Sequence, residues 1–312
     1  MKTLLAIILC GAVVSACSAG QERPGEPLTL ADPFVLFYEG TYYAYGTSSD
    51  DGFEVYRSDS LTSWECCPRL ALDKADSYGE KGFWAPEVYR NPGNGRFYLF
   101  YTAAEHLCVA TADSPLGPFR QSEKRPMFEE KAIDSSLFID DDGTPYLFFV
   151  RFTGGNIIWG AELESDWMSV KMETLRECIV AEQPWELAMG RVAEGPSVLK
   201  KEGVYYLIYS ANHYKSQDYG VGYATSDAPL GNWIKGDGPI LCRPEGGLVG
   251  TGHGALFRDR NGRDRYVFHA HCDREHIHPR ALHIADVDVA GGRVEIDSRS
   301  IFTPTVRRDR TK

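Results

Sequence analysis

The sequence is poor in long apolar runs and has no excess of basic residues. The apolar run at its start, from Leu4 to Val14, is shorter than the roughly 20 residues that a membrane-spanning helix needs. Lys and Arg number 33 against 44 Asp and Glu, which gives a formal net charge of −11. Because an acidic surface repels phosphate backbones, we expect no nucleic-acid partner.

Cysteine is sparse and shows no metal-binding spacing. Outside the N-terminal segment there are six cysteines, namely Cys66, Cys67, Cys108, Cys178, Cys242 and Cys272. They form neither a zinc pattern nor a dense disulfide framework, so we expect most of them to be buried as small hydrophobic residues. The histidine-rich segment FHAHCDREHIHPRALH lacks the carboxylate-histidine spacing of a metalloprotease, so its histidines are expected to serve packing or ligand contacts rather than catalytic zinc.

The N-terminal segment MKTLLAIILCGAVVSACSAG has the features of an export signal. Lys2 provides a positive start, an apolar run follows, and small residues end the segment. Val14 to Cys17 resembles a bacterial lipobox, whose cysteine is acylated; the alternative is an ordinary cleaved signal that contains a cysteine. We predict a signal peptide over 1–16, acylation of Cys17 and a tether over 17–27. The protein would be exported, lipid-anchored in the bacterial envelope at the periplasm or cell surface, and in contact with membrane only through its anchor.

Helical patterns are also scarce, with one candidate helix at 165–178. Short strands separated by Gly, Pro, Asn and Asp turns dominate instead, which is typical of an all-β fold. Five segments repeat an aromatic strand: TYYAYGTS from Thr41, RFYLFYTA from Arg96, TPYLFFVRF from Thr144, VYYLIYSAN from Val204 and DRYVFHAH from Asp264. Repeats of about this length, each able to give about four strands, predict a single five-bladed β-propeller over 28–312. The C-terminal segment is expected to close the ring by strand pairing or to fray in part.

An ionisable residue precedes the aromatic strand at nearly the same distance in every repeat. The five are Asp32, Glu87, Asp134, Glu194 and His253, each 11 to 13 residues before a tyrosine of its aromatic strand. Taken singly, an acidic residue beside Pro or Gly is usually a solvated turn residue. Their shared register favours a common site, because the first strand of each blade lines the axis of a propeller. We therefore expect the five side chains to converge at one end of the channel.

Carboxylates in different environments are what glycoside hydrolysis requires. One must be protonated to donate to the leaving oxygen, and the other must be ionised to activate water or to attack the anomeric carbon. Burial and neighbouring like charges raise the pKa of the acid, and a third carboxylate can orient it.

The segments ADPFV, FWAPEV, IDSSLFIDDDG, EGPSVLK and GTGH resemble those of glycoside hydrolase family 43, in family order and over essentially the whole mature chain. The resemblance implies a five-bladed propeller that removes arabinofuranose or xylose with inversion. It implies that Asp32 is the general base, that Glu194 is the general acid, and that Asp134 raises the pKa of that acid and orients it. The family often has proline after this aspartate, where Ser135 stands here, and a serine can hydrogen-bond Asp134 or the sugar.

Further residues are expected to bind the substrate. Trp84 and Phe34 adjoin the predicted site as apolar walls, with ordinary core packing as the alternative, and Glu87 belongs to the axial set. The resemblance implies that Arg280 reaches sugar hydroxyls and that His253 anchors the sugar or binds a metal through water. No cofactor is expected to be required, and a structural calcium at the axis is left open.

These features predict an inverting exo-glycosidase that releases terminal pentose, α-L-arabinofuranose in the first place, from plant cell-wall polysaccharides or oligosaccharides. β-Xylosidase and endo-arabinanase are the alternatives within the family, and the oligomeric state is left open. A sialidase would need repeated Ser-x-Asp-x-Gly-x-Thr-Trp boxes, which RSDSLTSW does not match. A non-catalytic glycan-binding propeller would be expected to have lost at least one of Asp32, Asp134 and Glu194.

Overall fold

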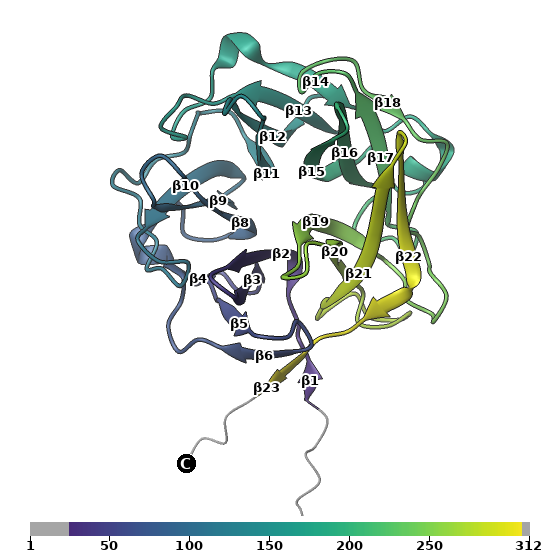
Figure 1. The fold of residues 1–312 in the computed structure, drawn as a ribbon, viewed down its shortest axis with the longest axis horizontal. Coiled ribbons are helices and arrows are strands. Elements are labelled where there is room, and N and C mark those ends of the chain that lie inside the picture. Colours follow the sequence, from purple (N-terminus) through teal and green to yellow (C-terminus); the bar gives the residue numbers. More distant parts are fainter. Residues whose placement is uncertain (1–24, 308–312) are drawn as a thin grey trace, which may run out of the picture.

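The protein is an all-β, five-bladed propeller, as the sequence predicts. The computed structural model describes residues 25–307, so the predicted signal peptide over 1–16 and the predicted acylation site Cys17 lie outside the described residues. Five sheets surround a central axis, and one edge strand of each sheet lies innermost (Figure 1). These inner strands are β2 (Ala31–Tyr38), β8 (Trp84–Arg90), β11 (Ala132–Ile139), β15 (Ala193–Lys201) and β19 (Gly252–Arg258).

The remaining strands of each blade follow outward from the axis. The second strands are β3 (Thr41–Thr47), β9 (Phe97–Ala103), β12 (Pro145–Phe152), β16 (Val204–Ala211) and β20 (Asp264–Ala270). The outer strands are β5 (Tyr56–Ser58), β6 (Ser63–Cys66), β10 (His106–Ala112), β13 (Asn156–Glu162), β14 (Arg176–Ile179), β17 (Gly220–Ser226), β18 (Ile234–Lys235), β21 (Ala281–Ala290) and β22 (Arg293–Phe302). A separate two-stranded sheet joins β4 (Gly52–Phe53) to β7 (Leu72–Asp73). Three short 3₁₀ helices complete the described elements, namely η1 (Lys74–Asp76), η2 (Met172–Thr174) and η3 (Pro184–Glu186). Within residues 25–307, no helix has the length and apolar character needed to cross a membrane.

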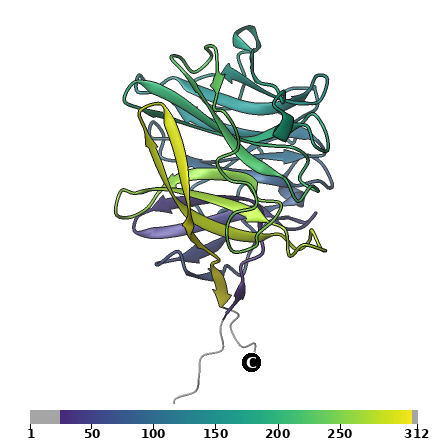
Figure 2. The ribbon, with the colours of Figure 1, turned by 90° about the vertical axis from the view of Figure 1, so that its right-hand side faces the viewer.

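The ring is closed by strands from both ends of the described chain. Strand β23 (Thr305–Arg307) lies parallel to β6 of the first blade, and β1 (Glu26–Pro27) pairs with β23 on its other side. Figure 2 shows both strands side by side at one edge of the molecule. The pairing covers an edge of the first blade that would otherwise expose unpaired backbone groups. The predicted strand pairing of the C-terminal segment is confirmed for these residues, and the last two residues of the predicted tether belong to a strand.

The aromatic second strands form the core because the packing of neighbouring blades covers both of their faces. All seven residues of β9 are buried, and seven of the eight residues of β16 are buried. Burial on both faces removes large aromatic surfaces from water, which is the main favourable contribution to folding. The recurrent aromatic segments of the sequence therefore mark the second strand of each blade.

Two predictions about local structure are wrong. The candidate helix at 165–178 consists of turns, the single 3₁₀ turn η2 and most of strand β14, because this segment forms the outer edge of the third blade. Among the six cysteines of the described chain only Cys108 is buried, whereas Cys66 and Cys272 are exposed. Most cysteines lie toward the outer strands and loops, where the inter-blade core does not cover them.

Candidate active site

Every innermost strand contains a β-bulge at the same place. The register with the second strand shifts at this point in all five blades. One residue of each bulge has positive φ: Asp32 (48°), Ala85 (47°), Asp134 (59°), Gly195 (57°) and His253 (42°). Positive φ is uncommon for residues other than glycine, so its recurrence indicates a feature that the surrounding structure imposes. The bulge directs the side chains of Asp32, Asp134 and His253 toward one end of the axis.

A ring of hydrogen bonds fixes these bulges. In four blades, the backbone N–H of the bulge residue donates to a side chain from the second strand of the preceding blade. The four bonds join Ala85 N to Thr47 Oγ1 (3.0 Å), Asp134 N to Thr102 Oγ1 (3.1 Å), His253 N to Ser210 Oγ (2.7 Å) and Asp32 N to His269 Nδ1 (3.1 Å). Buried backbone donors of this kind must be paired, so at these four junctions one blade holds the strained residue of the next.

The fifth junction differs in a way that links two carboxylates. Val150 occupies the equivalent position of the third blade and has no polar side-chain atom. The N–H of Gly195 donates to the carboxylate of Asp134 instead. Because Gly195 directly follows Glu194, this bond couples the position of Asp134 to that of Glu194.

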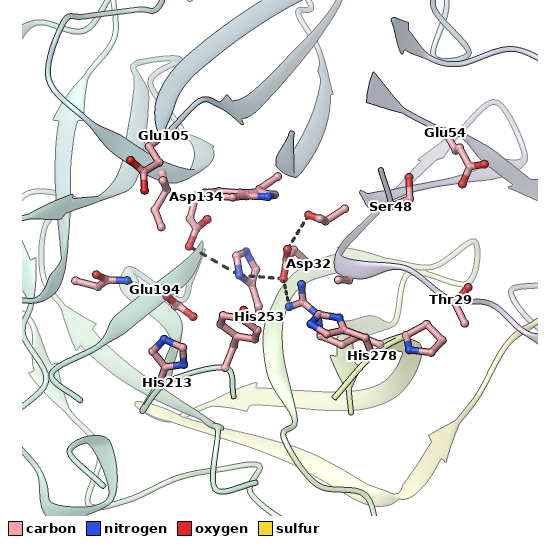
Figure 3. A pocket seen from close by; sticks show the side chains of 18 of the residues that line it. Thr29, Asp32, Ser48, Glu54, Glu105, Asp134, Glu194, His213, His253 and His278 are labelled. Atoms are coloured by element: carbon pink, nitrogen blue, oxygen red, sulfur yellow. Dashed lines mark hydrogen bonds and ion pairs between the residues drawn. The ribbon is translucent and has the colours of Figure 1, made fainter. Parts of the chain in front are cut away.

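The three predicted catalytic carboxylates line one pocket at this end of the propeller. The cavity has a volume of 930 Å³, and Asp32, Asp134 and Glu194 all contribute to its wall. Figure 3 shows the three side chains gathered around His253 in the middle of the pocket. His253 Nδ1 lies 3.5 Å from Asp32 Oδ1 and 3.8 Å from Asp134 Oδ2. All three carboxylates are buried in the protein.

Asp32 is held as a carboxylate. Burial alone would raise its pKa, but the positive charge of Arg280, together with His253 and His269, holds the pKa of Asp32 well below its usual range. Arg280 Nη1 lies 2.9 Å from Asp32 Oδ1, and the hydroxyl of Thr47 donates to Asp32 Oδ2 at 2.7 Å. Both oxygens of Asp32 therefore have a donor that favours the ionised form.

Glu194 and Asp134 favour the protonated form. Burial raises the pKa of Glu194 to about 7, although hydrogen bonds from the Tyr219 hydroxyl (2.9 Å) and the Asn156 amide (3.1 Å) act in the opposite direction. Burial and the charges of Glu194 and Asp32 raise the pKa of Asp134 well above its usual range. Within one pocket the carboxyl groups thus differ in protonation at mildly acidic pH.

Besides His253, two more of the predicted substrate-binding residues line the pocket, Trp84 and Arg280. Trp84 is 37% exposed and stands immediately before the bulge of the second blade. Arg280 packs over the ring of Tyr214 at 5.1 Å, and its Nε is buried with no partner in the described part of the chain. Because its Nη1 donates to Asp32, the guanidinium is fixed in the wall of the pocket.

The prediction that the Glu87 side chain joins the other axial side chains at one end of the channel is wrong. Phe34, predicted as an apolar wall, does not line the pocket either. Phe34 and Glu87 follow their bulges, pairing with Tyr45 and Phe100 respectively, and neither lines the pocket. Phe34 is buried against Tyr89 with ring centroids 5.2 Å apart, and the Tyr89 hydroxyl donates to Glu87. Burial raises the pKa of Glu87 to about 8.

The error for Glu87 comes from hairpin loops of unequal length. Two residues separate β2 from β3, whereas six separate β8 from β9. Counting back 11 residues from Tyr98, the distance that separates Asp32 from Tyr43, therefore reached Glu87, whereas the residue equivalent to Asp32 is Ala85. The same counting placed Glu194 one residue before the bulge position, which Gly195 occupies, yet its side chain still reaches the pocket.

Several residues that support the carboxylates were not predicted as site residues. Thr47, Asn156 and Tyr219 each bond a carboxylate, as described above. His269 was assigned only to packing or ligand contacts, whereas it lies fully buried next to Asp32. Burial and the charge of Arg280 lower the pKa of His269 to about 3, so its imidazole is neutral. A signal for Thr47 and His269 was present in the sequence, because both lie near the end of an aromatic strand. In the sheet, Thr47 pairs with Ala31 and His269 pairs with Gly252, the residues directly before the bulges.

The residues around His253 do not fit direct coordination of calcium. Calcium takes about six to eight oxygen ligands. Within residues 25–307, no group of three or more His, Cys, Asp and Glu side chains is arranged to hold a metal ion. Asp32, the nearest carboxylate, already binds the cation of Arg280. We therefore assign no step to a metal.

Ser135 stands where the family often has proline, and its side chain makes no hydrogen bond to another described residue. Its Oγ is buried, and of the two partners considered for this serine, Asp134 and the sugar, Asp134 is not bonded to it.

Comparisons with known proteins agree with this geometry. The sequence model of the family described as glycosyl hydrolases family 43 matches residues 22–290. The chain is 27% identical to a beta-D-galactofuranosidase of Aspergillus niger, covering 81% of this chain and 77% of the relative. It is 26% identical to an extracellular exo-alpha-(1->5)-L-arabinofuranosidase of Streptomyces chartreusis, covering 78% and 81%.

Solved structures show the same fold at higher identity. A structure named endo-1,4-beta-xylanase from Bacteroides thetaiotaomicron is 54% identical, with a TM-score of 0.87, covering 90% of this chain and 98% of that one. A thermostable family-43 glycoside hydrolase is 35% identical, with a TM-score of 0.79, covering 92% and 98%.

Proposed function

The chain belongs to glycosyl hydrolase family 43, and from this premise we propose that it is an inverting glycosidase that releases terminal α-L-arabinofuranose from plant cell-wall polysaccharides or oligosaccharides. The observation that carries the proposal is the opposite protonation of two carboxyl groups in one pocket. Asp32 is held ionised by Arg280, whereas burial keeps Glu194 protonated up to about pH 7.

The proposed reaction is a single displacement. Asp32 accepts a proton from a water molecule, whose oxygen attacks the anomeric carbon. The bond from that carbon to the leaving oxygen breaks, and the leaving oxygen takes the proton of Glu194. Asp134 accepts a hydrogen bond from the N–H of Gly195 and so orients the preceding residue, Glu194. Asp134 is itself a second protonated carboxyl group beside Glu194. Arg280 and His253 bind hydroxyl groups of the sugar, and Trp84 forms an apolar wall.

The preference for arabinofuranose is supported by the relative named exo-alpha-(1->5)-L-arabinofuranosidase. A second candidate is β-xylosidase or another xylan-directed activity, which is favoured by the 54% identity to a structure named endo-1,4-beta-xylanase. Endo-arabinanase action is a further alternative, because relatives of about 26% identity carry that name. Arabinose and xylose present similar hydroxyl groups, so the same carboxylates serve either sugar.

Hydrolysis of paired chromogenic substrates tests the proposal. Wild type and Asp32→Asn are assayed with aryl α-L-arabinofuranoside and aryl β-D-xylopyranoside. We expect release from the arabinofuranoside by wild type and none by the variant. Faster release from the xylopyranoside would transfer the proposal to the xylosidase. Wild-type protein that binds oligosaccharide but hydrolyses neither substrate, nor any pentose polymer, would indicate a glycan-binding propeller.

We also propose export and lipid anchoring through Cys17. The support is the sequence of residues 1–17, with its short apolar run ending in Val-Ser-Ala-Cys. Metabolic labelling with a radioactive fatty acid tests this: label is expected on wild type and not on Cys17→Ser. Equal labelling of both proteins would contradict it.

A further inference from the structure

The proposed general acid and general base do not lie on neighbouring blades. Glu194 belongs to β15 and Asp32 to β2, and the inner strand β19 of the fifth blade packs between these two strands (Figure 1). Inversion requires about 6.5–9.5 Å between the two carboxyl groups, so that a water molecule fits beside the sugar. The groups that bridge β15 and β2 next to β19 therefore bear directly on this spacing.

Two stacked rings bridge the acid and the base in this region. The Tyr219 hydroxyl donates to Glu194 Oε1 at 2.9 Å, and the Tyr219 ring stacks on the His269 imidazole with centroids 5.8 Å apart and planes 14° apart. His269 Nδ1 in turn accepts the backbone N–H of Asp32 at 3.1 Å. Both rings are fully buried, so packing fixes their positions. A continuous series of contacts thus runs from Glu194 to Asp32.

Gly252 provides the space in which the Tyr219 ring lies. Gly252 pairs with His269 across the hairpin of β19 and β20, next to the stacked rings. A methyl group on Gly252 would lie 2.6 Å from Tyr219 Cδ1 and closer still to Cε1. Carbon atoms in van der Waals contact are about 3.5 to 4.0 Å apart, so any larger residue at this position displaces the ring. Gly252 lacks the positive φ that favours glycine, so the requirement comes from this contact.

The backbone of Tyr219 leaves the ring as the part that can yield. The Tyr219 N–H donates to the carbonyl of Ser216 at 3.1 Å, and the Tyr219 carbonyl accepts the hydroxyl of Thr251 at 3.5 Å. Strand β17 begins at the next residue. A crowded Tyr219 therefore responds by moving its ring, which withdraws the hydroxyl from Glu194 and the ring face from His269.

We propose that Gly252 is a positioning residue: its missing side chain lets Tyr219 hold the acid Glu194 at a fixed spacing from the base. His269 extends this contact to Asp32. Neither Gly252 nor Tyr219 nor His269 lines the pocket, so the three act on the substrate only through the two carboxyl groups. The inference rests on the proposed function, because it assigns a role in the proton transfer of that reaction.

Gly252→Ala is expected to impair proton donation selectively. On a methyl pentoside, whose leaving group needs a proton, kcat/KM should fall by about tenfold or more because the acid is no longer held in place. On the dinitrophenyl pentoside of the same sugar, whose leaving group needs no proton, the loss should be at most about twofold. The alkaline limb of the pH profile should move to higher pH, because the lost hydrogen bond favours the ionised form of Glu194.

The matched control is Gly222→Ala, which crowds another tyrosine ring of the fourth blade. A methyl group there would lie 2.9 Å from Trp185 Cζ2 and 3.0 Å from Tyr209 Cζ. Tyr209 donates to Glu186, which does not line the pocket. Gly222→Ala is therefore expected to keep the pH profile and the leaving-group dependence of wild type. Equal losses by Gly252→Ala on the two pentosides, or an alkaline limb at the wild-type pH, would overturn the proposal.

A double variant shows whether the effect passes through Tyr219. Tyr219→Leu removes the ring and leaves room for the methyl group, so adding Gly252→Ala to Tyr219→Leu is expected to change neither the rates nor the limb. Ser210 Oγ would be the next nearest atom, at 3.0 Å. A loss that persists in the Tyr219→Leu background would assign the effect to Ser210 and overturn the proposal. If Gly252→Ala alone does not fold, the double variant should fold as Tyr219→Leu does, and its failure to fold would likewise overturn the proposal.

Urea unfolding at several pH values separates this proposal from the proposed function. Absence of any hydrolysis by wild type would overturn the proposed function. The pH range over which the folded protein loses stability would still report the titration of Glu194. Gly252→Ala is expected to move the upper end of that range to higher pH, and Gly222→Ala is not. An unchanged range in Gly252→Ala would overturn the role of Gly252.

Discussion

Replacing Glu194 with glutamine is expected to make the protein more stable at alkaline pH while abolishing its proton donor. Glu194 is buried, and its carboxyl has a pKa of about 7 in place of its ordinary 4.5. Below pH 4.5 this group is protonated in both the folded and the unfolded chain. Between the two values only the folded chain keeps the proton, so the folded state loses stability as the pH rises. The loss is complete above pH 7.

The magnitude follows from the two pKa values. One pH unit corresponds to about 1.4 kcal/mol, so the difference between 4.5 and 7 gives a penalty of about 3 kcal/mol on the free energy of unfolding above pH 7. Glutamine has nearly the same shape and stays neutral. The stability difference between Glu194→Gln and wild type should therefore grow by about 3 kcal/mol between pH 4.5 and pH 8.

Urea unfolding followed by tryptophan fluorescence at several pH values measures this difference. Glu295→Gln, at an exposed position of β22, is the control for the removal of one negative charge. The reasoning would be refuted if Glu194→Gln and Glu295→Gln showed the same pH dependence as wild type. Glu194 would then ionise without cost, and it would not be prepared to act as an acid near neutral pH.

Three other results are expected. In Tyr219→Phe, loss of the hydroxyl that donates to Glu194 should raise the pKa of Glu194, so the fall of kcat/KM near pH 7 should move to higher pH; an unchanged limb would contradict this. Arg280→Met should raise the pKa of Asp32 and bring the acid limb of the pH profile into the measurable range, whereas Arg280→Lys, which keeps the charge, should not. Chelation with EDTA should leave both the activity and the melting temperature unchanged, because the residues around His253 do not fit a direct metal site; a drop in either would point to a calcium held through water.

The fold could be predicted from the sequence because the blades repeat. Because each aromatic strand is buried on both faces, nearly all its residues are apolar. Such a segment is easily recognised in the sequence, so its copies can be counted. Five such segments predicted five blades, and the family's short segments marked the first strands. The closing pair β1 and β23 was harder to place, since strands of two or three residues leave little pattern.

The site could be predicted only in part because side-chain position depends on details that spacing does not fix. Asp32, Asp134 and His253 share one position in their blades, and counting found it. Glu87 was misplaced by the longer loop between β8 and β9. The support of Asp32 by His269 crosses from the fifth blade to the first, and the support of Glu194 by Asn156 crosses from the third blade to the fourth, so neither follows from the spacing within one blade.

The stereochemistry of the first product tests the central claim most directly. Proton NMR of a rapid digest of the aryl glycoside that wild type cleaves reports the configuration of the released sugar before it mutarotates. If Asp32 activates water while Glu194 protonates the leaving oxygen, the first product has the inverted configuration and Asp32→Asn gives none. A first product with retained configuration would mean that a carboxylate attacks the sugar itself, which would contradict the roles proposed for this pair.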